Sequence, residues 1–477
     1  MDTVATSNQQ VEIDQVFSVQ QQNLRKLAST TVKQRKTKLK KILHFLSQEE
    51  NLEALYTAMY KDFRKPKAEV LLSEVSVVLQ HIRYILPRLG RWMSPQPRKG
   101  NLAIIGTRSF IQTDPKGNVL IIAPWNYPFQ LAIQPLAYAI AAGNTVIIKP
   151  SEMTIHTSAF LKKMLGELFP LEEVAVFEGA VETAQALLQK PFNHIFFTGS
   201  PRVGKLVMSA AAQHLCSVTL ELGGKSPAII DRKSNLKSVA EKTAWGKCLN
   251  GGQTCIAPDY LLLHADDQEA WVQAYQQALD KFYGADDMAK KASPSLARMI
   301  QSGHAERLRV LIDDAISKGA KIACGGQVDV EMAYVAPTLL TNVTMDMSIM
   351  QEEIFGPILP VINYETKADI LEIIEKNPNP LTAYLSTQRS AMKDWFVQNI
   401  RAGGMVINDY LLGFGNPNLP FGGVNNSGIG KSMGKQSFIE FSNEKGIIHR
   451  RFGTLNFIFP PYTKTKEKLI QAMGKWV

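Results

Sequence analysis

Short apolar segments that alternate with helical stretches constrain the fold of this chain more than any other feature. A first series of such segments lies at residues 118–124, 144–150, 174–179, 194–199 and 217–224. Helical stretches such as HTSAFLKKMLGELF and GKLVMSAAAQHL separate them. Because a continuously apolar strand must be covered on both faces, and intervening helices provide that cover, the pattern predicts an α/β fold with a doubly wound parallel sheet.

A second series of apolar segments follows, at residues 259–266, 336–343, 358–365, 381–387 and 404–409. It again alternates with helical stretches, and 477 residues are too many for one simple core. We therefore expect two tandem α/β domains with a boundary near 224–230. Before them, residues 20–95 carry a helical pattern that SPQPRKGN interrupts, and an extended arm is predicted after this break.

Composition narrows the class of protein. The chain is 45% hydrophobic and 20% charged, which is typical of a globular protein. Its cysteines are scattered and form no CxxC pair, which argues against a disulfide framework and against a zinc site. We expect no metal site and a reducing compartment. The cysteines are Cys216, Cys248, Cys255 and Cys324.

Charge and hydropathy exclude further classes. Part of the net charge of +10 lies in residues 33–45, a pattern typical of the solvated face of a helix, and no nucleic-acid-binding motif accompanies it. The N-terminus lacks the pattern of a secretory signal, and no run of 18 apolar residues occurs. These features favour a soluble, cytoplasmic protein that does not bind nucleic acid.

Unusual stretches lie at or near the ends of predicted strands, where ligands gather in α/β sheets. In HIFFTGSPRVGK a strand leads through Gly199 to a helix that contains Gly204, and a helix N-terminus there could offer backbone N–H groups to a phosphate. A strand-to-helix turn also needs glycine for its own geometry. Pro201 suits the first helical position, where its missing N–H costs little.

Two further stretches carry polar side chains after strands. In NTVIIKPSE, Lys149 and Glu152 could bind ribose hydroxyls, although Ser151 could simply cap a helix there. In APWNYPF, the neutral amide of Asn126 suits the stabilisation of an oxyanion, although asparagine is also a common turn former.

The remaining two stretches carry an acid and a thiol. In ELGGKSP, Glu221 ends an apolar strand, where desolvation would raise its pKa, and the following glycines would let a flat ring approach the backbone. A glutamate at a sheet edge is otherwise usually solvated. In NGGQTCIAPDY, Cys255 is either a small buried hydrophobe or a nucleophile.

Seven motifs together resemble the aldehyde dehydrogenase superfamily in their order and spacing: APWNYPF, KPSE, FTGSPRVG, ELGGKSP, GGQTCIAPDY, EEIFGP and FGGVNNSGIGK. The resemblance covers about residues 20–450. WNYPF, the QTCIAPDY run and a compact N-terminus are most similar to the class 3, or fatty-aldehyde, branch. The fold implied is two Rossmann-like domains, one for the cofactor and one for catalysis, with a small β oligomerisation flap.

The resemblance implies oxidation of an aldehyde to its carboxylic acid through a cysteine thiohemiacetal and a thioester. Cys255 would be the nucleophile, while the amide of Asn126 and the backbone N–H of Cys255 would bind the oxyanion. Glu221 would be the general base, with Glu353 of EEIFGP as the second candidate; Glu353 would also contact the nicotinamide ribose. Phe355 would pack against the nicotinamide ring.

The resemblance also implies a cofactor. Glu152 would repel a 2′-phosphate, which points to NAD, but Arg202 in the glycine turn could offset that repulsion and allow NADP as well. The cofactor-binding residues implied are Trp125, Lys149, Glu152, Gly199, Ser200, Gly204, Glu353 and Phe355.

The domain organisation follows from the same resemblance and implies a homodimer. Residues 1–100 and 118–224 would form the cofactor-binding domain and 225–415 the catalytic domain. Residues 101–117 and 416–452 would form oligomerisation and bridging segments, and 453–477 a basic amphipathic tail.

The sequence leaves open the identity of the aldehyde and the role of the tail. Aromatic neighbours of the site favour an apolar aldehyde, aliphatic or aromatic. The tail, with Leu469, Ile470, Met473 and Trp476, could lie on a membrane surface, cover the substrate entrance or pack on its own dimer; the first of these would make long-chain aldehydes plausible. Two other functions remain, a CoA-acylating dehydrogenase and a non-catalytic structural protein with the same fold.

Overall fold

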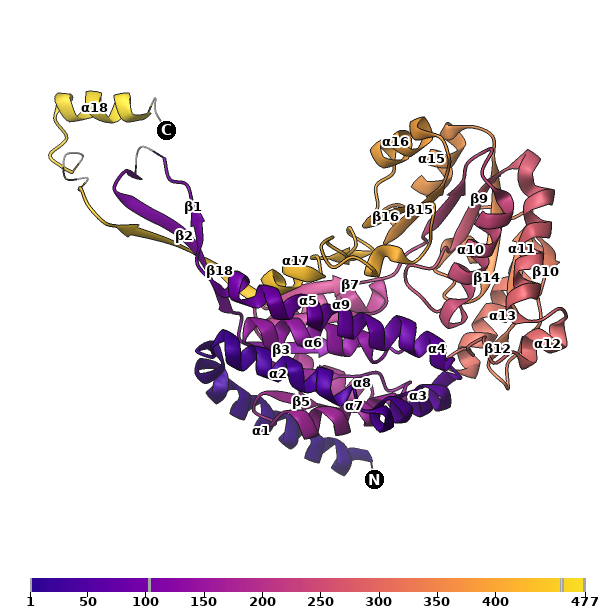
Figure 1. Cartoon of the computed structure of the whole chain (residues 1–477), viewed down its shortest axis with the longest axis horizontal. Coiled ribbons are helices and arrows are strands. Elements are labelled where there is room, and N and C mark those ends of the chain that lie inside the picture. Colours follow the sequence, from indigo (N-terminus) through magenta and orange to yellow (C-terminus); the bar gives the residue numbers. More distant parts are fainter. Residues whose placement is uncertain (1, 102–103, 455, 457–458, 475–477) are drawn as a thin grey trace.

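A computed structural model describes residues 2–101, 104–454, 456 and 459–474 of the chain. Two α/β domains lie side by side, and a thin three-stranded sheet projects away from them (Figure 1). The predicted fold class, two tandem α/β domains with parallel sheets and a small β flap, is confirmed.

The first domain is built on a six-stranded sheet of order β17-β7-β6-β3-β4-β5. Its strands are parallel except β17, which runs antiparallel to β7. Their carboxyl ends therefore lie along one edge of the sheet. The strands are β3 (Asn118–Ile122), β4 (Thr145–Lys149), β5 (Val174–Val176), β6 (His194–Thr198), β7 (Ser217–Glu221) and β17 (Gly428–Ile429).

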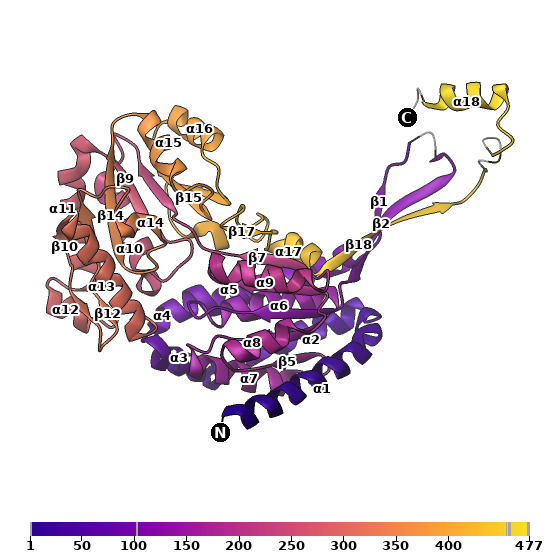
Figure 2. The ribbon, with the colours of Figure 1, turned by 180° about the vertical axis from the view of Figure 1, so that it is seen from behind.

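Helices cover both faces of this sheet, as its continuously apolar strands require. Val119 and Ile121 pack into one core with α2, α3, α5, α6 and α7, whereas Leu120 and Ile147 face α1, α8 and α9 on the other side. The helices are α1 (Asp2–Ala28), α2 (Val32–Phe45), α3 (Glu49–Phe63), α4 (Lys67–Val70), α5 (Ser76–Met93), α6 (Gln130–Ala142), α7 (Ile155–Leu168), α8 (Val181–Leu188), α9 (Pro201–Ala212) and α17 (Gly434–Glu440). Figure 2 shows the face covered by α1, α8 and α9.

The second domain is built on a seven-stranded sheet of order β10-β13-β14-β9-β8-β15-β16, parallel except at β10. Its strands are β8 (Pro227–Ile230), β9 (Tyr260–His264), β10 (Lys321–Cys324), β13 (Thr338–Thr341), β14 (Ile358–Tyr364), β15 (Thr382–Ser386) and β16 (Gly404–Ile407). A separate pair is formed by β11 (Val328–Asp329) and β12 (Tyr334–Val335).

Helices also cover both faces of the second sheet. Ala228 and Leu261 pack with α10 and α11, whereas Ile229 and Leu262 pack with α13, α15 and α16. The helices are α10 (Leu236–Cys248), α11 (Gln268–Tyr283), α12 (Asp287–Ala292), α13 (Ser302–Ser317), α14 (Ser348–Gln351), α15 (Lys367–Glu375) and α16 (Ser390–Asn399).

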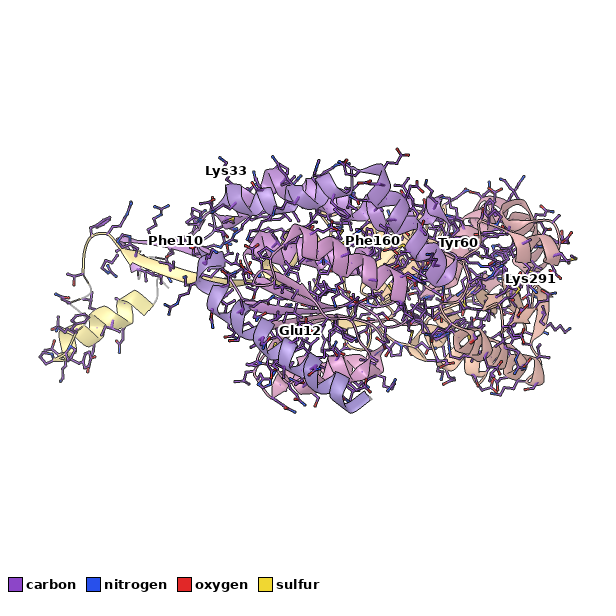
Figure 3. The ribbon with its side chains drawn as sticks, turned by 90° about the horizontal axis from the view of Figure 1, so that it is seen from below. Glu12, Lys33, Tyr60, Phe110, Phe160 and Lys291 are labelled. Atoms are coloured by element: carbon purple, nitrogen blue, oxygen red, sulfur yellow. The ribbon has the colours of Figure 1, made fainter. Side chains whose placement is uncertain are left out.

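The flap is a three-stranded antiparallel sheet of β1 (Gln96–Arg98), β2 (Thr107–Pro115) and β18 (Ser442–Arg450), in the order β1-β2-β18. Phe110 marks it in Figure 3. The flap sheet thus begins before residue 101. The segment 416–452 is divided, because β17 and α17 join the first domain and only β18 joins the flap.

The tail helix α18 (Lys464–Gly474) lies at the far end of the flap (Figures 1 and 2). Leu469 and Ile470 are 43% and 40% exposed. Trp476 and the side chain of Met473 lie outside the described residues.

One helix, Lys67–Met93, is long and apolar enough to cross a membrane by length and composition alone. It comprises α4, a π-helical turn at Leu71–Val75, and α5. Its residues Val78, Ile82 and Ile85 are fully buried in the core of the first domain, where the helix contacts α2 and α6.

Arg35 of α2 joins three helices. Its Nη1 donates to the carbonyls of Ala141 and Ala142 at 3.0 and 2.6 Å, at the C-terminus of α6, and its Nη2 donates to that of Ala28 at 3.1 Å. The guanidinium therefore satisfies carbonyls that a helix end leaves free and complements the helix dipole. Burial lowers the pKa of Arg35 to about 10.

We expect Arg35→Met to lower the free energy of unfolding of the first domain by about 2–4 kcal/mol, because it leaves these buried carbonyls without a donor. Lys40→Met, at an exposed position of the same helix, should change it by less than about 0.5 kcal/mol. Urea unfolding followed by circular dichroism would measure both. Equal midpoints for the two variants would contradict this role of Arg35.

Candidate active site

Most of the residues singled out from the sequence meet in one cleft of about 770 Å³. The first sheet contributes loops at its carboxyl edge, and the second domain contributes the segments around residues 255 and 353. The predicted residues that line the cleft are Trp125, Asn126, Gly199, Ser200, Glu221, Cys255, Glu353 and Phe355.

The loop before Cys255 has an unusual backbone. Asn250, Gly251 and Gly252 have φ values of 57°, 62° and 75°, in the left-handed region. At Gly252 a Cβ would collide with the backbone of Gly356, so only glycine allows the two chain segments to approach this closely. The GGQTC and EEIFGP motifs are therefore held against each other through the main chain.

Asn126 is 3% exposed and is held by the same loop. Its Nδ2 donates to the carbonyl of Gln253 at 3.0 Å, and its own carbonyl accepts from Nδ2 of Asn250 at 2.9 Å. An amide nitrogen has two N–H groups, so one remains for a ligand beside Cys255.

Glu221 ends β7 and is 6% exposed. Its Oε1 accepts a hydrogen bond of 2.6 Å from the hydroxyl of Ser432, whereas its Oε2 is buried and has no hydrogen-bond partner among the described residues. Desolvation raises the pKa of Glu221 to about 8, partly offset by the Ser432 hydrogen bond and the charge of Lys431. A buried carboxyl with a free oxygen is suited to accept a proton near neutral pH.

Glu353 lies on the opposite motif and packs on the ELGGKSP backbone. A Cβ at Gly223 would collide with its carboxylate, and the backbone of Gly224 donates a hydrogen bond to it. Desolvation, with a contribution from Asp259, raises the pKa of Glu353 to about 8.

One buried ion pair connects three motifs. Lys225 of ELGGKSP pairs with Asp259 of APDY, and its Nζ also donates to the carbonyl of Glu352 at 2.9 Å. Asp259 in turn accepts the backbone N–H of Ile354 at 3.1 Å. This pair therefore holds the segment that carries Glu353 in a fixed position relative to the segment that follows β7, the strand that ends at Glu221.

The Cys255 thiol is strongly affected by its surroundings. Burial raises its pKa well above the usual value, and the nearby Glu353 and Glu221 carboxyls raise it further. The backbone N–H groups of Cys255 and Ile256 act in the opposite direction. The thiol is therefore protonated at neutral pH until a base removes its proton.

Aromatic rings form one wall of the cleft. The rings of Trp125 and Phe355 meet edge to face, with centroids 5.2 Å apart, and His304 meets Trp125 at 5.0 Å. Phe355 has a φ of 53°, in the left-handed region that bulky residues rarely adopt, so the backbone turns sharply within the EEIFGP motif.

The glycine turn forms a second wall. Ser200 caps α9, and Pro201 occupies the first helical position, as expected. Arg202 and Lys205 add positive charge to the cleft lining. Gly204 does not line the cleft; a Cβ there would press against Leu222, so this glycine permits close packing of helix and strand.

Lys149 and Glu152 also lie outside the cleft lining. Lys149 ends β4 and Glu152 follows it, at the same edge of the sheet, and Nζ of Lys149 is 3.0 Å from Oε2 of Glu152. Glu152 is exposed and Lys149 is buried.

Sequence reasoning missed two residues that position the acids. Ser432, which holds Glu221, immediately follows the FGGVNNSGIGK motif, and this position was the signal that could have found it. Arg307 of α13 donates to the carbonyl of Ile354 and to Oε1 of Glu352 at 3.0 Å. It lies on an ordinary amphipathic helix, so no local pattern marks it.

A second, smaller pocket adjoins the cleft at Glu221 and Cys255. Its lining is mostly apolar: Leu131, Gln134, Pro135, Phe196, Thr198, Glu221, Leu222, Cys255, Leu381, Phe414, Phe421, Ser432 and Ser437. The rings of Phe414 and Phe421 contact each other, with centroids 4.4 Å apart. Cys255 and Glu221 thus lie between a larger, more polar cleft and a smaller apolar pocket.

Comparison with known proteins defines the class. Residues 1–447 match the aldehyde dehydrogenase family. The chain is 43% identical over 437 residues to the putative aldehyde dehydrogenase AldX of Bacillus subtilis, which covers 92% of this chain and 97% of AldX. It is 41% identical over 443 residues to the 4,4'-diaponeurosporen-aldehyde dehydrogenase of Staphylococcus aureus, with 92% and 94% covered. Aldehyde dehydrogenase family 3 member H1 of Arabidopsis thaliana is 39% identical over 441 residues, with 92% and 90% covered.

Solved structures of aldehyde dehydrogenases are also similar to this chain. A substrate-bound state of Staphylococcus aureus AldH superposes with a TM-score of 0.91 at 39% identity, covering 97% of this chain and 99% of that one. An NAD⁺ complex of an aldehyde dehydrogenase from Bacillus cereus gives 0.84 at 28% identity, covering 92% and 89%.

The chain therefore belongs to the aldehyde dehydrogenase family. It is an NAD(P)-dependent aldehyde dehydrogenase, and its relatives include the family 3 members predicted from the motifs.

Proposed function

We propose that this enzyme oxidises an apolar aldehyde to the carboxylic acid through a covalent bond to Cys255. The observation that carries the proposal is that Cys255, Asn126 and Glu221 line one cleft, with Cys255 and Glu221 at its junction with the apolar pocket. A nucleophile, an oxyanion donor and a base are the groups that acyl chemistry of this kind requires.

The Cys255 sulfur attacks the carbonyl carbon after its proton has been taken by a carboxylate, and the carbonyl oxygen becomes an alkoxide. The free N–H of the Asn126 amide and the backbone N–H of Cys255 bind that oxygen. The Asn126 amide is already oriented by the Asn250–Gln253 loop, so little reorganisation of this donor accompanies the development of charge.

The residues of the larger cleft fit a dinucleotide. The α9 N-terminus, Arg202 and Lys205 suit its phosphates, and Glu353, Phe355 and Trp125 line the end beside Cys255. When bound, the nicotinamide supplies the acceptor for the hydride that leaves the substrate carbon. We propose Lys149 and Glu152 as ribose contacts, with Gly199, Ser200 and Gly204 shaping the phosphate turn.

Glu221 then activates the water that releases the acid from the Cys255 thioester. Its Oε2 has no hydrogen-bond partner in the part of the chain that the structure describes, whereas the Glu353 carboxyl accepts a hydrogen bond from the Gly224 backbone. We therefore assign the base to Glu221 and a cofactor contact to Glu353. With a water-activating base available, transfer to CoA is not required.

An apolar substrate is supported by the lining of the smaller pocket, where Leu131, Phe414 and Phe421 surround the approach to Cys255. Burial of such surface against an alkyl or aryl group contributes about 25 cal/mol per Å². The aldehyde in the name of the Staphylococcus aureus relative is consistent with this class of substrate.

We also propose a homodimer formed through the flap. β18 is an edge strand of nine residues, and an open edge of that length readily pairs with another chain. Ile448 and Phe452 at this end of the molecule are 64% and 69% exposed, which is consistent with an interface.

Cys255→Ala should abolish NADH formation from a medium-chain aldehyde without added CoA, because no nucleophile remains. Asn126→Ala should lower kcat by about 10²–10³-fold, through loss of one oxyanion donor. Cys216→Ala, directly before β7 and at the end of that strand opposite Glu221, is the matched control and should retain activity. NADH formation by Cys255→Ala would overturn the proposed function.

The pH dependence should separate Glu221 from Glu353. A general base works only when deprotonated, so thioester hydrolysis should rise as the pH passes through about 8, the pKa of Glu221. Glu221→Gln should give at most one equivalent of NADH per site and then stall, whereas Glu353→Gln should continue to turn over. Ser432→Ala removes a hydrogen bond that lowers the Glu221 pKa. The rise in the rate of thioester hydrolysis should therefore occur at a higher pH in this variant. A stall in Glu353→Gln alone would transfer the role of base to Glu353.

The flap and the tail can be tested with one pair of proteins, the full chain and a form ending at Arg451. Both should be dimers by light scattering, because the flap strands are present in each. Co-sedimentation with anionic liposomes tests whether the tail contacts a membrane, one of the alternatives that the sequence leaves open, in which case only the full chain should sediment. Equal partitioning would remove the membrane contact, and a monomeric full chain would contradict the dimer.

A further inference from the structure

A group of charged residues lies behind the cleft and takes no part in the reaction described above. Lys65 and Glu74 have side chains that are 0% exposed and form an ion pair of 2.7 Å between Nζ and Oε1. Glu69 is partly buried on the same helical segment, and its carboxyl is close enough to Lys65 to be affected by its charge. Burying such groups is costly unless they are paired and hydrogen-bonded.

The contacts of this group reach both loops of the active site. Oε2 of Glu74 accepts the backbone N–H of Gln130 at 2.7 Å, at the start of α6 and directly after the loop that carries Asn126. Nζ of Lys65 lies 4.0 Å from the ring centroid of Tyr127. The hydroxyl of Tyr127 is 2.6 Å from that of Thr254, the residue before Cys255.

Glu69 makes the most direct of these contacts and joins the two domains. Its Oε2 accepts the backbone N–H of Asn250 at 2.8 Å, and Asn250 begins the left-handed turn of the cysteine loop. The turn would otherwise leave this N–H buried without a partner. A carboxylate acceptor makes the hydrogen bond stronger than a neutral one.

Asn250 transmits this restraint to the oxyanion donor. Its Nδ2 donates to the carbonyls of Asn126 and Gln253, at 2.9 and 3.2 Å, and Nδ2 of Asn126 donates to the same carbonyl of Gln253 at 3.0 Å. The position of Asn250 therefore determines where the Asn126 amide lies relative to Cys255.

We propose that Glu69 is a positioning residue of the active site, which acts through Asn250 to align the Asn126 amide with Cys255. Glu69 lies outside the cleft lining and does not touch the reacting atoms. The inference rests on the proposed roles of Asn126 and Cys255. It assigns to the α4 helix of the first domain a direct effect on the catalytic loop of the second.

The test compares Glu69→Ala with Glu69→Gln. Alanine removes the acceptor and should lower kcat about 10- to 100-fold, as expected for a small misplacement of a catalytic group, with KM for the aldehyde changed less than about threefold. Glutamine keeps an acceptor oxygen and should restore kcat to within about threefold of the wild type. Glu53→Ala, which removes an exposed partner of Lys67, is the matched control and should be unchanged.

A double-mutant cycle distinguishes positioning from a general loss of stability. If Glu69 acts through Asn126, its loss should matter little once the Asn126 amide is absent. The kcat of the double variant should then be less than about threefold below that of Asn126→Ala alone. NADH titration counts the folded sites, so that kcat is expressed per site. Full additivity with Asn126→Ala, an unchanged kcat in Glu69→Ala, or no rescue by glutamine would each overturn the proposal. The proposed function is tested separately, by Cys255→Ala.

Discussion

The close approach of the Gly252 backbone to Gly356 is the constraint on which the site depends. It brings the segment that leads to Cys255 against the segment that follows Glu353, with no side chain between them. The Lys225–Asp259 ion pair then ties the second of these segments to the strand that ends at Glu221. Main-chain contacts within the second domain, which tolerate little displacement, thus set the positions of Cys255 and Glu353 relative to each other, and the Lys225–Asp259 pair relates this arrangement to Glu221 of the first domain.

Desolvation determines the charge state of these groups. Glu221 and Glu353 both have a pKa raised to about 8, chiefly by burial, and Cys255 is raised as well. Three acidic groups therefore share the site largely in their neutral forms at neutral pH, which avoids the repulsion that three adjacent anions would create. Because their titrations are coupled, removing one proton changes the affinity of the others for theirs.

The sequence predicted the parts of the structure that depend on local patterns. Alternation of apolar strands with helices predicted both sheets, and the strand ends predicted where Asn126, Glu221 and Gly199 would lie. The short strand β8 was not predicted, because PAII follows a glycine pair and resembles a loop. The return of β17 and α17 to the first domain, after the whole second domain, was also not predicted, since pairing between distant segments leaves no local signature.

Positioning residues were the hardest to find from the sequence. Ser432, Arg307 and Glu69 act through a single hydrogen bond or a carbonyl contact with a distant segment. Each lies in a stretch whose own pattern is explained by helix formation or by a turn. Such residues become visible only when the partner is known, whereas a cysteine after two glycines is conspicuous by itself.

The protonated state of Cys255 has a consequence for chemical durability. Peroxides and similar oxidants attack thiolates far faster than thiols, and burial together with two neighbouring carboxyls keeps this sulfur in its thiol form at rest. Cys255, the sulfur proposed as the nucleophile, is therefore protected at rest from oxidants that attack thiolates, because its anion forms only when a base takes the proton.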